Sequence, residues 1–557
     1  MKFLLLLAIL TASISGQDLP SCDSKVYCQG NLLHTVQMAK IFNDSKTFVD
    51  MKMVNDEKTT LANFDKFWSD TNQNPSKDQV RKFVNENFEM YNEFDDWVPG
   101  DLTDNPEILS RIDNEEIRQF TQDLVNIWPK LARKIKKEVI DNPGLFTLLP
   151  VDNGFVIPGG RFKEFYYWDS YWIIKGLLVS QMNQTVRGML DNFLSIVDKY
   201  GFLPNGARIY YLNRSQPPLL NLMVATYIDA TNDTKWLQDN IKILDKELRY
   251  WLDNKLVEVT KNGTTYTMAH YDSESGFPRP ESYYEDVITA STLSSEEARK
   301  QLYADLKSGA ESGWDFSTRW IVDETGGTSA NLTSLHTRRI IPVDLNSFLC
   351  QAFRKLAEFY VILHDYENSI FWYEKSFLWQ KTIDEVLYNK EDGIWYDWDN
   401  ELGQHRKIFF PSNFAPLWAE AYDLSKADVL GERAAQYADD QKLLDYEGGI
   451  PASLTRSGEQ WDYPNAWPPL QSIVVMGLDR SGNCQAKELA KELARRWVTA
   501  NLIGFNQTNE MFEKYDAEVP GQYGGGGEYV IQSGFGWTNG VALEFIERFY
   551  TVSEKKH

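Results

Sequence analysis

Apolar residues recur at spacings of three and four over long stretches of this chain, and this period predicts helices. One such face covers residues 117–135, where Pro129 is expected to kink a single long helix. Another covers residues 345–363, and its helix is expected to begin with Asp344 as the N-cap. A break in the pattern then precedes a helix expected over residues 369–388.

The predicted helices come in pairs, each followed by an irregular aromatic loop such as residues 393–398. Two more helices are predicted around residues 489–497 and 541–550, and no half of the chain is rich in strands. The simplest account is one large, mostly α domain over residues 61–557. Residues 17–60 are expected to form an N-terminal extension packed on its surface.

Composition excludes several classes of partner. The 557 residues carry a net charge of −23, from 57 basic and 80 acidic side chains. Such a surface repels nucleic acids and anionic membranes, so neither is expected as a partner. Neither Cys-x-x-Cys nor His-Glu-x-x-His occurs among the few histidines and cysteines, so no metal site is expected. We expect a monomer.

The N-terminus is typical of an exported protein. Residues 1–16 contain a basic start, an apolar run and small residues for cleavage, which predicts a signal peptide. No later segment is long and apolar enough to span a membrane, and no hydrophobic tail for a lipid anchor ends the chain. A secreted, extracellular protein is therefore expected.

The cysteines and the glycosylation sequons fit an oxidising compartment. Cys22 and Cys28 are expected to form a disulfide. Cys350 lies in an apolar helical run and is expected to be a buried thiol, whereas Cys484 receives no assignment. Glycans are predicted at exposed sequons. The predicted acceptors are Asn43, Asn183, Asn232, Asn262, Asn331 and Asn506. The sequon at Asn213 is expected to remain bare because it adjoins a candidate binding residue.

Two segments combine aromatic rings with charged groups: residues 157–172 (IPGGRFKEFYYWDSYW) and 460–469 (QWDYPNAWPP). A sugar needs this combination, because its C–H faces stack on rings while its hydroxyls require fixed donors and acceptors. Aromatic core packing beside an ion pair is the alternative interpretation of either segment taken alone.

Two carboxyl groups stand out as candidates for acid–base chemistry. Asp315 lies between Trp314 and Phe316, which could shield it from water and so raise its pKa towards that of a general acid. A helix N-cap is the alternative role for this residue. Glu513 lies in a mixed-charge segment, where a solvated glutamate is the ordinary expectation.

These segments closely resemble the motifs of the α,α-trehalases, inverting glycoside hydrolases that split trehalose. The resemblance extends from about Lys46 to Phe549 and includes Gly-Trp-Asp-Phe at 313–316 and Glu-Lys-Tyr at 513–515, followed by a four-glycine run. It implies an (α/α)6 barrel, a toroid of six helical hairpins with short irregular or β excursions in the loops. It also implies Asp315 as the general acid and Glu513 as the general base, with no cofactor.

Hydrolysis with inversion requires room for a water molecule, so the two carboxyl groups are expected about 6.5–9.5 Å apart. The resemblance further implies a set of substrate-binding residues. They are Arg161, Trp168, Asp169, Asn205, Arg214, Ser215, Gln216, Arg279, Pro280, Glu281, Gly313 and Glu528, with Trp461 and Trp467 as stacking platforms. The glycine-rich run is expected to be a mobile loop that closes over the sugar. Gly313 is expected to let the sugar approach the backbone.

The binding set contains three arginines, Arg161, Arg214 and Arg279. They are expected to span neighbouring hydroxyls of the neutral sugar and to lower the pKa of Glu513. Structural ion pairing is the alternative for any one of them. Two other functions stay open: a glucoamylase-like hydrolase on the same barrel, and a sugar-binding protein without activity. Hydrolysis of trehalose, a small-molecule substrate, would distinguish a trehalase from both of these alternatives.

Overall fold

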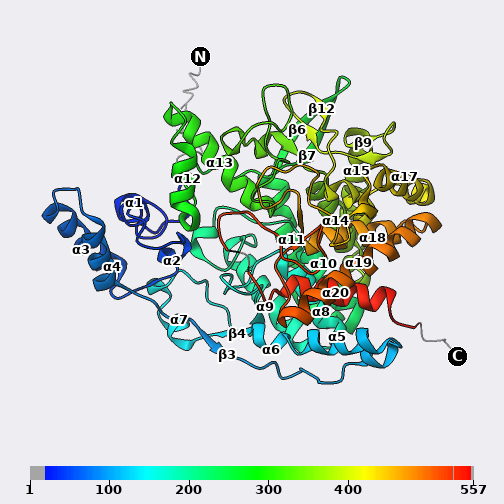
Figure 1. Cartoon of the computed structure of the whole chain (residues 1–557), viewed down its shortest axis with the longest axis horizontal. Coiled ribbons are helices and arrows are strands. Elements are labelled where there is room, and N and C mark those ends of the chain that lie inside the picture. The colour runs from blue at the N-terminus through cyan, green and yellow to red at the C-terminus, as the bar shows by residue number, and fades with distance from the viewer. Residues whose placement is uncertain (1–18, 531, 553–557) are drawn as a thin grey trace, which may run out of the picture.

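The computed structural model describes residues 19–530 and 532–552 (Figure 1). The predicted signal peptide, residues 1–16, lies outside the described residues. Helices dominate, and they form the predicted (α/α)6 barrel. The inner helices within the described part of the chain contact one another in a closed ring. In ring order they are α8 (Asp169–Val179), α10 (Leu220–Thr231), α14 (Val343–Ile362), α16 (Ala415–Ala419), α18 (Pro468–Arg480) and α20 (Gly536–Phe549), which packs against α8.

A second layer of helices surrounds this ring. It contains α5 (Glu115–Val125), α9 (Asn183–Tyr200), α11 (Thr234–Asn254), α15 (Tyr366–Val386), α17 (Ala427–Asp440) and α19 (Cys484–Thr508). The two layers differ in pattern: α18 is buried on nearly all sides, whereas α11 buries one face and exposes the other. Local signals set the ends of the outer helices, since Asp233 caps α11 and Gly201 ends α9 with a positive φ of 90°.

Two of the predicted helix details are wrong. The single kinked helix over residues 117–135 is divided into α5, the short α6 (Trp128–Leu131) and strand β4 (Ala132–Ile135). The apolar residues of this last part face the core from a strand that pairs with β3 and β5, so tertiary pairing overrides the helical period. Asp344 lies inside the first turn of α14, behind the N-cap Pro342, and its carboxylate binds the buried Arg319 at 2.7 Å.

The remaining helices and strands lie outside the two layers of the barrel. The other helices are α1 (Gly30–Met38), α2 (Lys46–Val49), α3 (Glu57–Asp70), α4 (Lys77–Asn87), α7 (Lys137–Asp141), α12 (Tyr283–Ala290) and α13 (Glu296–Ser312). The strands are β1 (Lys52–Met53), β2 (Phe88–Glu89), β3 (Phe94–Asp96), β5 (Phe155–Val156), β6 (Leu256–Lys261), β7 (Thr264–Ala269), β8 (Ile340–Ile341), β9 (Tyr388–Asn389), β10 (Ile394–Trp395), β11 (Trp398–Asp399), β12 (Gln404–His405), β13 (Asn465–Ala466) and β14 (Tyr515–Asp516). All pairings between these strands are antiparallel.

A small N-terminal unit around α1–α4 projects from one side of the barrel (Figure 1). Its apolar residues form a hydrophobic cluster separate from the barrel core. This cluster also includes Tyr166, Tyr210 and Tyr211 from the barrel loops, so the unit packs against the wall of the site described below. The Cys22–Cys28 disulfide lies in this unit, as predicted, and Cys350 is a buried thiol, as predicted.

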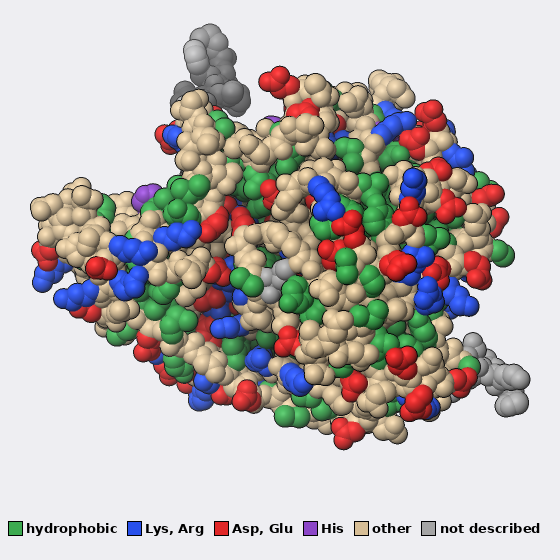
Figure 2. Space-filling view, in the orientation of Figure 1, with side chains coloured by type: hydrophobic (Ala, Val, Ile, Leu, Met, Phe, Trp, Pro, Cys, Tyr) green, Lys and Arg blue, Asp and Glu red, His purple; other side chains and the backbone are tan. Residues whose placement is uncertain are grey.

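Charged side chains of both signs are spread over the face of the molecule shown in Figure 2. Within the described residues, no helix combines the length and the apolar composition that crossing a membrane requires.

Candidate active site

A pocket lies at one end of the barrel, where chain segments that lead into inner helices converge. Residues 161–168 precede α8, residues 205–216 precede α10, and Trp461 and Trp467 precede α18. The segment from Glu513 to Phe535 precedes α20. The pocket encloses about 660 Å³ of space free of atoms, including its open mouth. Because the inner helices run in the same direction, motifs that are distant in sequence meet at one place.

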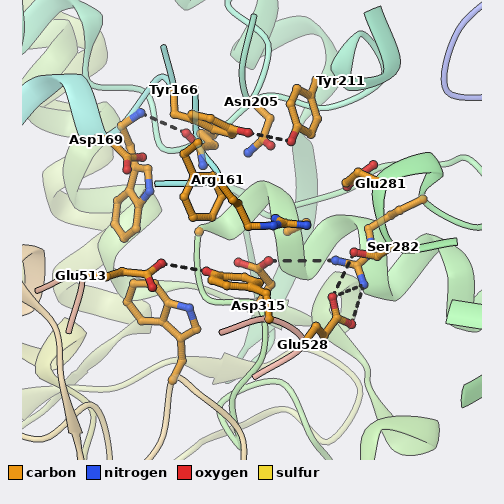
Figure 3. A pocket seen from close by; sticks show the side chains of 18 of the residues that line it. Arg161, Tyr166, Asp169, Asn205, Tyr211, Glu281, Ser282, Asp315, Glu513 and Glu528 are labelled. Carbon is orange, nitrogen blue, oxygen red and sulfur yellow. Dashed lines mark hydrogen bonds and ion pairs between the residues drawn. The ribbon is translucent and has the colours of Figure 1, made fainter. Parts of the chain in front are cut away.

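All of the predicted catalytic and binding residues except Ser215 and Pro280 line this pocket. Figure 3 shows that the labelled acidic residues come from separate segments and converge on one space. Ser215 is fully buried, and its hydroxyl donates to the carbonyl of Leu203 at 2.7 Å. The carbonyl of Pro280 accepts from Nε2 of Gln37 at 3.0 Å. These two residues therefore hold the backbone next to residues that do line the pocket.

Asp315 follows the C-terminus of α13, with Gly313 as the C-cap at a φ of 78°. Its neighbours Trp314 and Phe316 are buried, as the sequence predicts. The carboxyl opens into the pocket, and the side chain is 35% exposed. Burial is the largest cause that raises the pKa of Asp315 to about 7, and the guanidinium of Arg279, 4.0 Å away, acts against it.

Glu513 lies beyond the end of α19 and is 1% exposed. The hydroxyl of Tyr529 donates to Oε1 at 2.8 Å, and the backbone N–H of Gln532 donates to Oε2 at 3.3 Å. Burial raises the pKa of Glu513, while the charge of Lys514, these two donors and the charge of Arg161 all lower it. The predicted effect of a neighbouring cation thus has the right sign, but burial outweighs it, and the pKa stays above its usual range.

Asp169 is a third carboxyl group on the pocket wall, at the first position of α8. Its burial, together with the charges of Glu513 and Asp315, raises its pKa to about 8. Glu281 and Glu528 also line the pocket, and so many carboxyl groups cannot all ionise without a large electrostatic cost. The geometry therefore favours a mixture of neutral and ionised acids, which is what acid–base chemistry at a glycosidic bond requires.

Each of the three predicted arginines pairs with a carboxylate and also reaches the pocket. Arg214 binds Glu281 at 2.6 Å through Nη2, yet its Nε and Nη1 have no hydrogen-bond partner in the described part of the chain. Oε2 of Glu281 is likewise buried without a partner among those residues. Buried polar atoms without partners are costly, so these donors and this acceptor point to a polar ligand.

Arg161 and Arg279 are held more completely. Asp44, from the N-terminal unit, binds Arg161 through two contacts of 2.8 Å. Arg279 binds Asp286 at 2.6 Å and Glu528 at 3.1 Å. Arg161 and Arg279 therefore form structural ion pairs and also line the pocket.

The aromatic residues form a stack. The rings of Trp461 and Trp467 are parallel, with centroids 3.9 Å apart, and both line the pocket. Gly313 lines the pocket, and its predicted role in the approach of a sugar stays a prediction, but packing also requires a glycine here. A Cβ at this position would lie 2.7 Å from the ring of Trp168, which already fills the space.

The glycine-rich loop is fastened on both sides of the pocket. Gly525 exchanges two hydrogen bonds with the side-chain amide of Asn465, at 2.7 and 2.9 Å. Glu528 accepts from Ser282 at 3.0 Å and from Arg279. In this structure these contacts hold the loop beside the pocket, and Glu528 and Tyr529 line it. The predicted mobility of the loop stays a prediction.

Several lining residues were missed. Tyr166 lies inside the quoted segment 157–172, Tyr211 lies three residues before Arg214, and Tyr529 follows Glu528, so their position close to predicted residues was an available signal. Phe535 and Trp537 follow the glycine-rich loop and begin α20. The sequence carried no signal for Asp44, because only the tertiary structure places it on Arg161.

Comparison with known proteins agrees with this geometry. A family model described as Trehalase matches residues 40–550. A trehalase of Tenebrio molitor is 67% identical over 552 residues, covering 99% of this chain and 100% of the relative. A human trehalase is 44% identical, covering 98% of this chain and 93% of the relative. Among solved structures, the neutral trehalase of Saccharomyces cerevisiae has a TM-score of 0.56 at 25% identity, covering 72% of this chain and 74% of its own.

Proposed function

Because this chain belongs to the trehalase family, we propose that it hydrolyses α,α-trehalose to two glucose molecules with inversion at the attacked carbon. The observation that carries the proposal is the pairing of Asp315 and Glu513 in one pocket, with different environments. Desolvation raises the pKa of Asp315 to about 7, and Asp315 lacks the two donors that Glu513 has, so it favours the neutral form. Glu513 accepts two hydrogen bonds that favour its ionised form.

In this mechanism, Asp315 gives its proton to the bridging oxygen as the bond from that oxygen to C1 breaks. Glu513 removes a proton from a water molecule whose oxygen bonds to C1 on the opposite face of the ring. Asp315 ends ionised and Glu513 ends neutral, and proton exchange with solvent restores both. No covalent intermediate forms. The separation of about 6.5–9.5 Å between the carboxyl groups stays a prediction of this mechanism.

The binding roles rest on polar groups that have no hydrogen-bond partner among the described residues. The free donors of Arg214 and the free oxygen of Glu281 would bind sugar hydroxyls. Asp169, with a pKa of about 8, would be neutral and could both donate and accept. Trp461 and the other pocket rings would contact the C–H faces of the glucose units.

The cellular setting is part of the proposal. Residues 1–16 would direct secretion, and the disulfide in the N-terminal unit fits an oxidising compartment. Most of the predicted glycan acceptors are exposed on the surface, as an N-linked glycan requires. Mass spectrometry of the secreted protein with and without glycosidase treatment would identify the occupied sites. An extracellular protein without glycans at any of them would contradict this part.

The main test uses purified protein and a panel of trehalose, maltose and isomaltose. Release of glucose from trehalose alone is expected. Proton NMR early in turnover should show one β-glucose for each α-glucose, because inversion changes one anomeric centre and retains the other. Release of α-glucose only would rule out inversion, and preference for maltose would favour a glucoamylase-like enzyme.

A further inference from the structure

The side-chain amide of Gln460 lies between the two segments that carry the proposed acid and base. Gln460 is 3% exposed. Its Nε2 donates to the backbone carbonyl of Asp315, and its Oε1 accepts from Nζ of Lys514 at 3.0 Å. Lys514 is buried and directly follows Glu513 in the chain. One side chain therefore joins the backbone of the acid to the neighbour of the base.

The backbone of Gln460 is itself immobilised. Its carbonyl accepts from Nε1 of Trp467 at 2.8 Å and from Nδ2 of Asn465 at 2.9 Å. The next residue, Trp461, donates its backbone N–H to the carbonyl of Phe316 at 3.0 Å. Gln460 is thus anchored to the stacked tryptophans and to the chain that follows Asp315. Its amide can therefore hold the segments of Asp315 and Glu513 at a fixed separation.

The glycine-rich loop also lies against the side-chain amide of Gln460. A Cβ on Gly527 would lie 2.6 Å from Oε1 of Gln460, and the φ of Gly527 is 96°. Nζ of Lys514 also donates to the carbonyl of Gly526 at 3.4 Å. The acid segment, the base segment and the loop therefore meet at one buried side chain.

We propose that Gln460 is a positioning residue that sets the distance between Asp315 and Glu513. The proposal rests on the acid and base roles assigned above. A carbonyl and an ammonium group on opposite sides require a donor and an acceptor on one side chain, and a glutamine amide supplies both. Methionine keeps the length but offers neither, whereas an ionised glutamate keeps only the acceptor. Because acid–base catalysis depends on placement to within about 1 Å, loosening this link should lower kcat more than it changes KM.

The test compares Gln460→Met with Gln471→Met. Gln471 in α18 is a matched control: it is 1% exposed, and its amide exchanges hydrogen bonds of 2.8 and 2.7 Å with the backbone of Ile450. Its Nε2 also donates to the backbone carbonyl of Trp467, one turn earlier, at 3.2 Å, and none of these contacts involves the segments of Asp315 or Glu513. We expect Q460M to lower kcat for trehalose by about 100-fold with KM within about threefold. Q471M should lower the melting temperature but keep kcat within about twofold of wild type.

The melting temperature of each variant separates misplacement from loss of fold. If Q460M does not fold, Gln460→Glu replaces it, since it keeps the shape of the side chain and its contact with Lys514. It should lower kcat by about tenfold, because its carboxylate cannot donate to the carbonyl of Asp315. A folded variant at position 460 with wild-type kcat, or equal losses of kcat in Q460M and Q471M, would overturn the proposal. An inactive wild-type enzyme would instead refute the proposed function.

Discussion

The segment that carries Asp315 and the segment that carries Glu513 expose the same kind of group to one pocket, but they are built differently. Asp315 follows a long helix and lies between two buried aromatic residues. Glu513 lies in irregular chain and depends on donors from the loop that follows it. The comparison teaches that desolvation is the largest cause that raises the pKa of both carboxyl groups. At Glu513 the charge of Lys514 and two hydrogen-bond donors act against it. At Asp315 the charge of Arg279 acts against it, while the charge of Glu528 adds to it.

Removing either carboxyl group should give the largest effect. Asp315→Asn and Glu513→Gln keep size and shape but cannot transfer a proton. We expect each to lower kcat by about 10²–10⁴-fold, measured by glucose release at saturating trehalose. Melting temperatures near that of the wild type would show that the fold is retained. An active D315N or E513Q variant would refute the assigned role of that residue.

The donor to the base provides the next test. In Tyr529→Phe, Oε1 of Glu513 loses a hydrogen bond that favours the ionised form, so the pKa of Glu513 should rise. Because Glu513 must be ionised to act, the acidic limb of kcat/KM should move to higher pH, and kcat should fall by about tenfold.

Tyr523→Phe is a matched control for this substitution, since Tyr523 is 57% exposed and packs edge-on against Phe512. Its pH profile should match that of the wild type. An unchanged acidic limb in Y529F would show that the hydroxyl does not tune the base.

The pKa of the acid, Asp315, can be changed by substituting a charged neighbour. The negative charge of Glu528 raises the pKa of Asp315, and Glu528 also pairs with Arg279. In Glu528→Gln the positive charge of Arg279 is less compensated, so both changes lower the pKa of Asp315. Since Asp315 must be protonated to act, the alkaline limb of kcat should move to lower pH. A shift to higher pH would contradict this electrostatic account.

The smallest effect is expected from the N-terminal unit. Asp44→Asn weakens the two contacts that hold Arg161 on the pocket wall. We expect KM for trehalose to rise by about two- to tenfold with little change in kcat. Asp56→Asn, which changes only an exposed helix cap of α3, serves as the control. Equal KM values in D44N and wild type would show that Arg161 needs no help from this unit.

Much of the site could be predicted because its residues lie in compact motifs. Trp461 and Trp467 were predicted as platforms, and they stack in the pocket. Ser215 and Pro280 are next to Arg214 and Arg279 in the chain but do not line the pocket, because adjacent residues in an irregular segment face different directions. For Asp344 the prediction was wrong for another reason. Its position suggested a helix cap, but its carboxylate binds the buried Arg319, which lies 25 residues earlier in the chain.

By itself, the sequence determined the helical period, the disulfide partners and the kinds of side chain available for acid–base chemistry. Only the tertiary structure decided that Asp315 and Glu513 share a pocket, because each precedes or follows a helix whose place in the ring depends on all the others. It also decided the environment that shifts their pKa values, since the charges of Arg279 at Asp315 and of Arg161 at Glu513 come from other segments of the chain. Short-range patterns act through neighbouring residues, whereas desolvation and charge act through space.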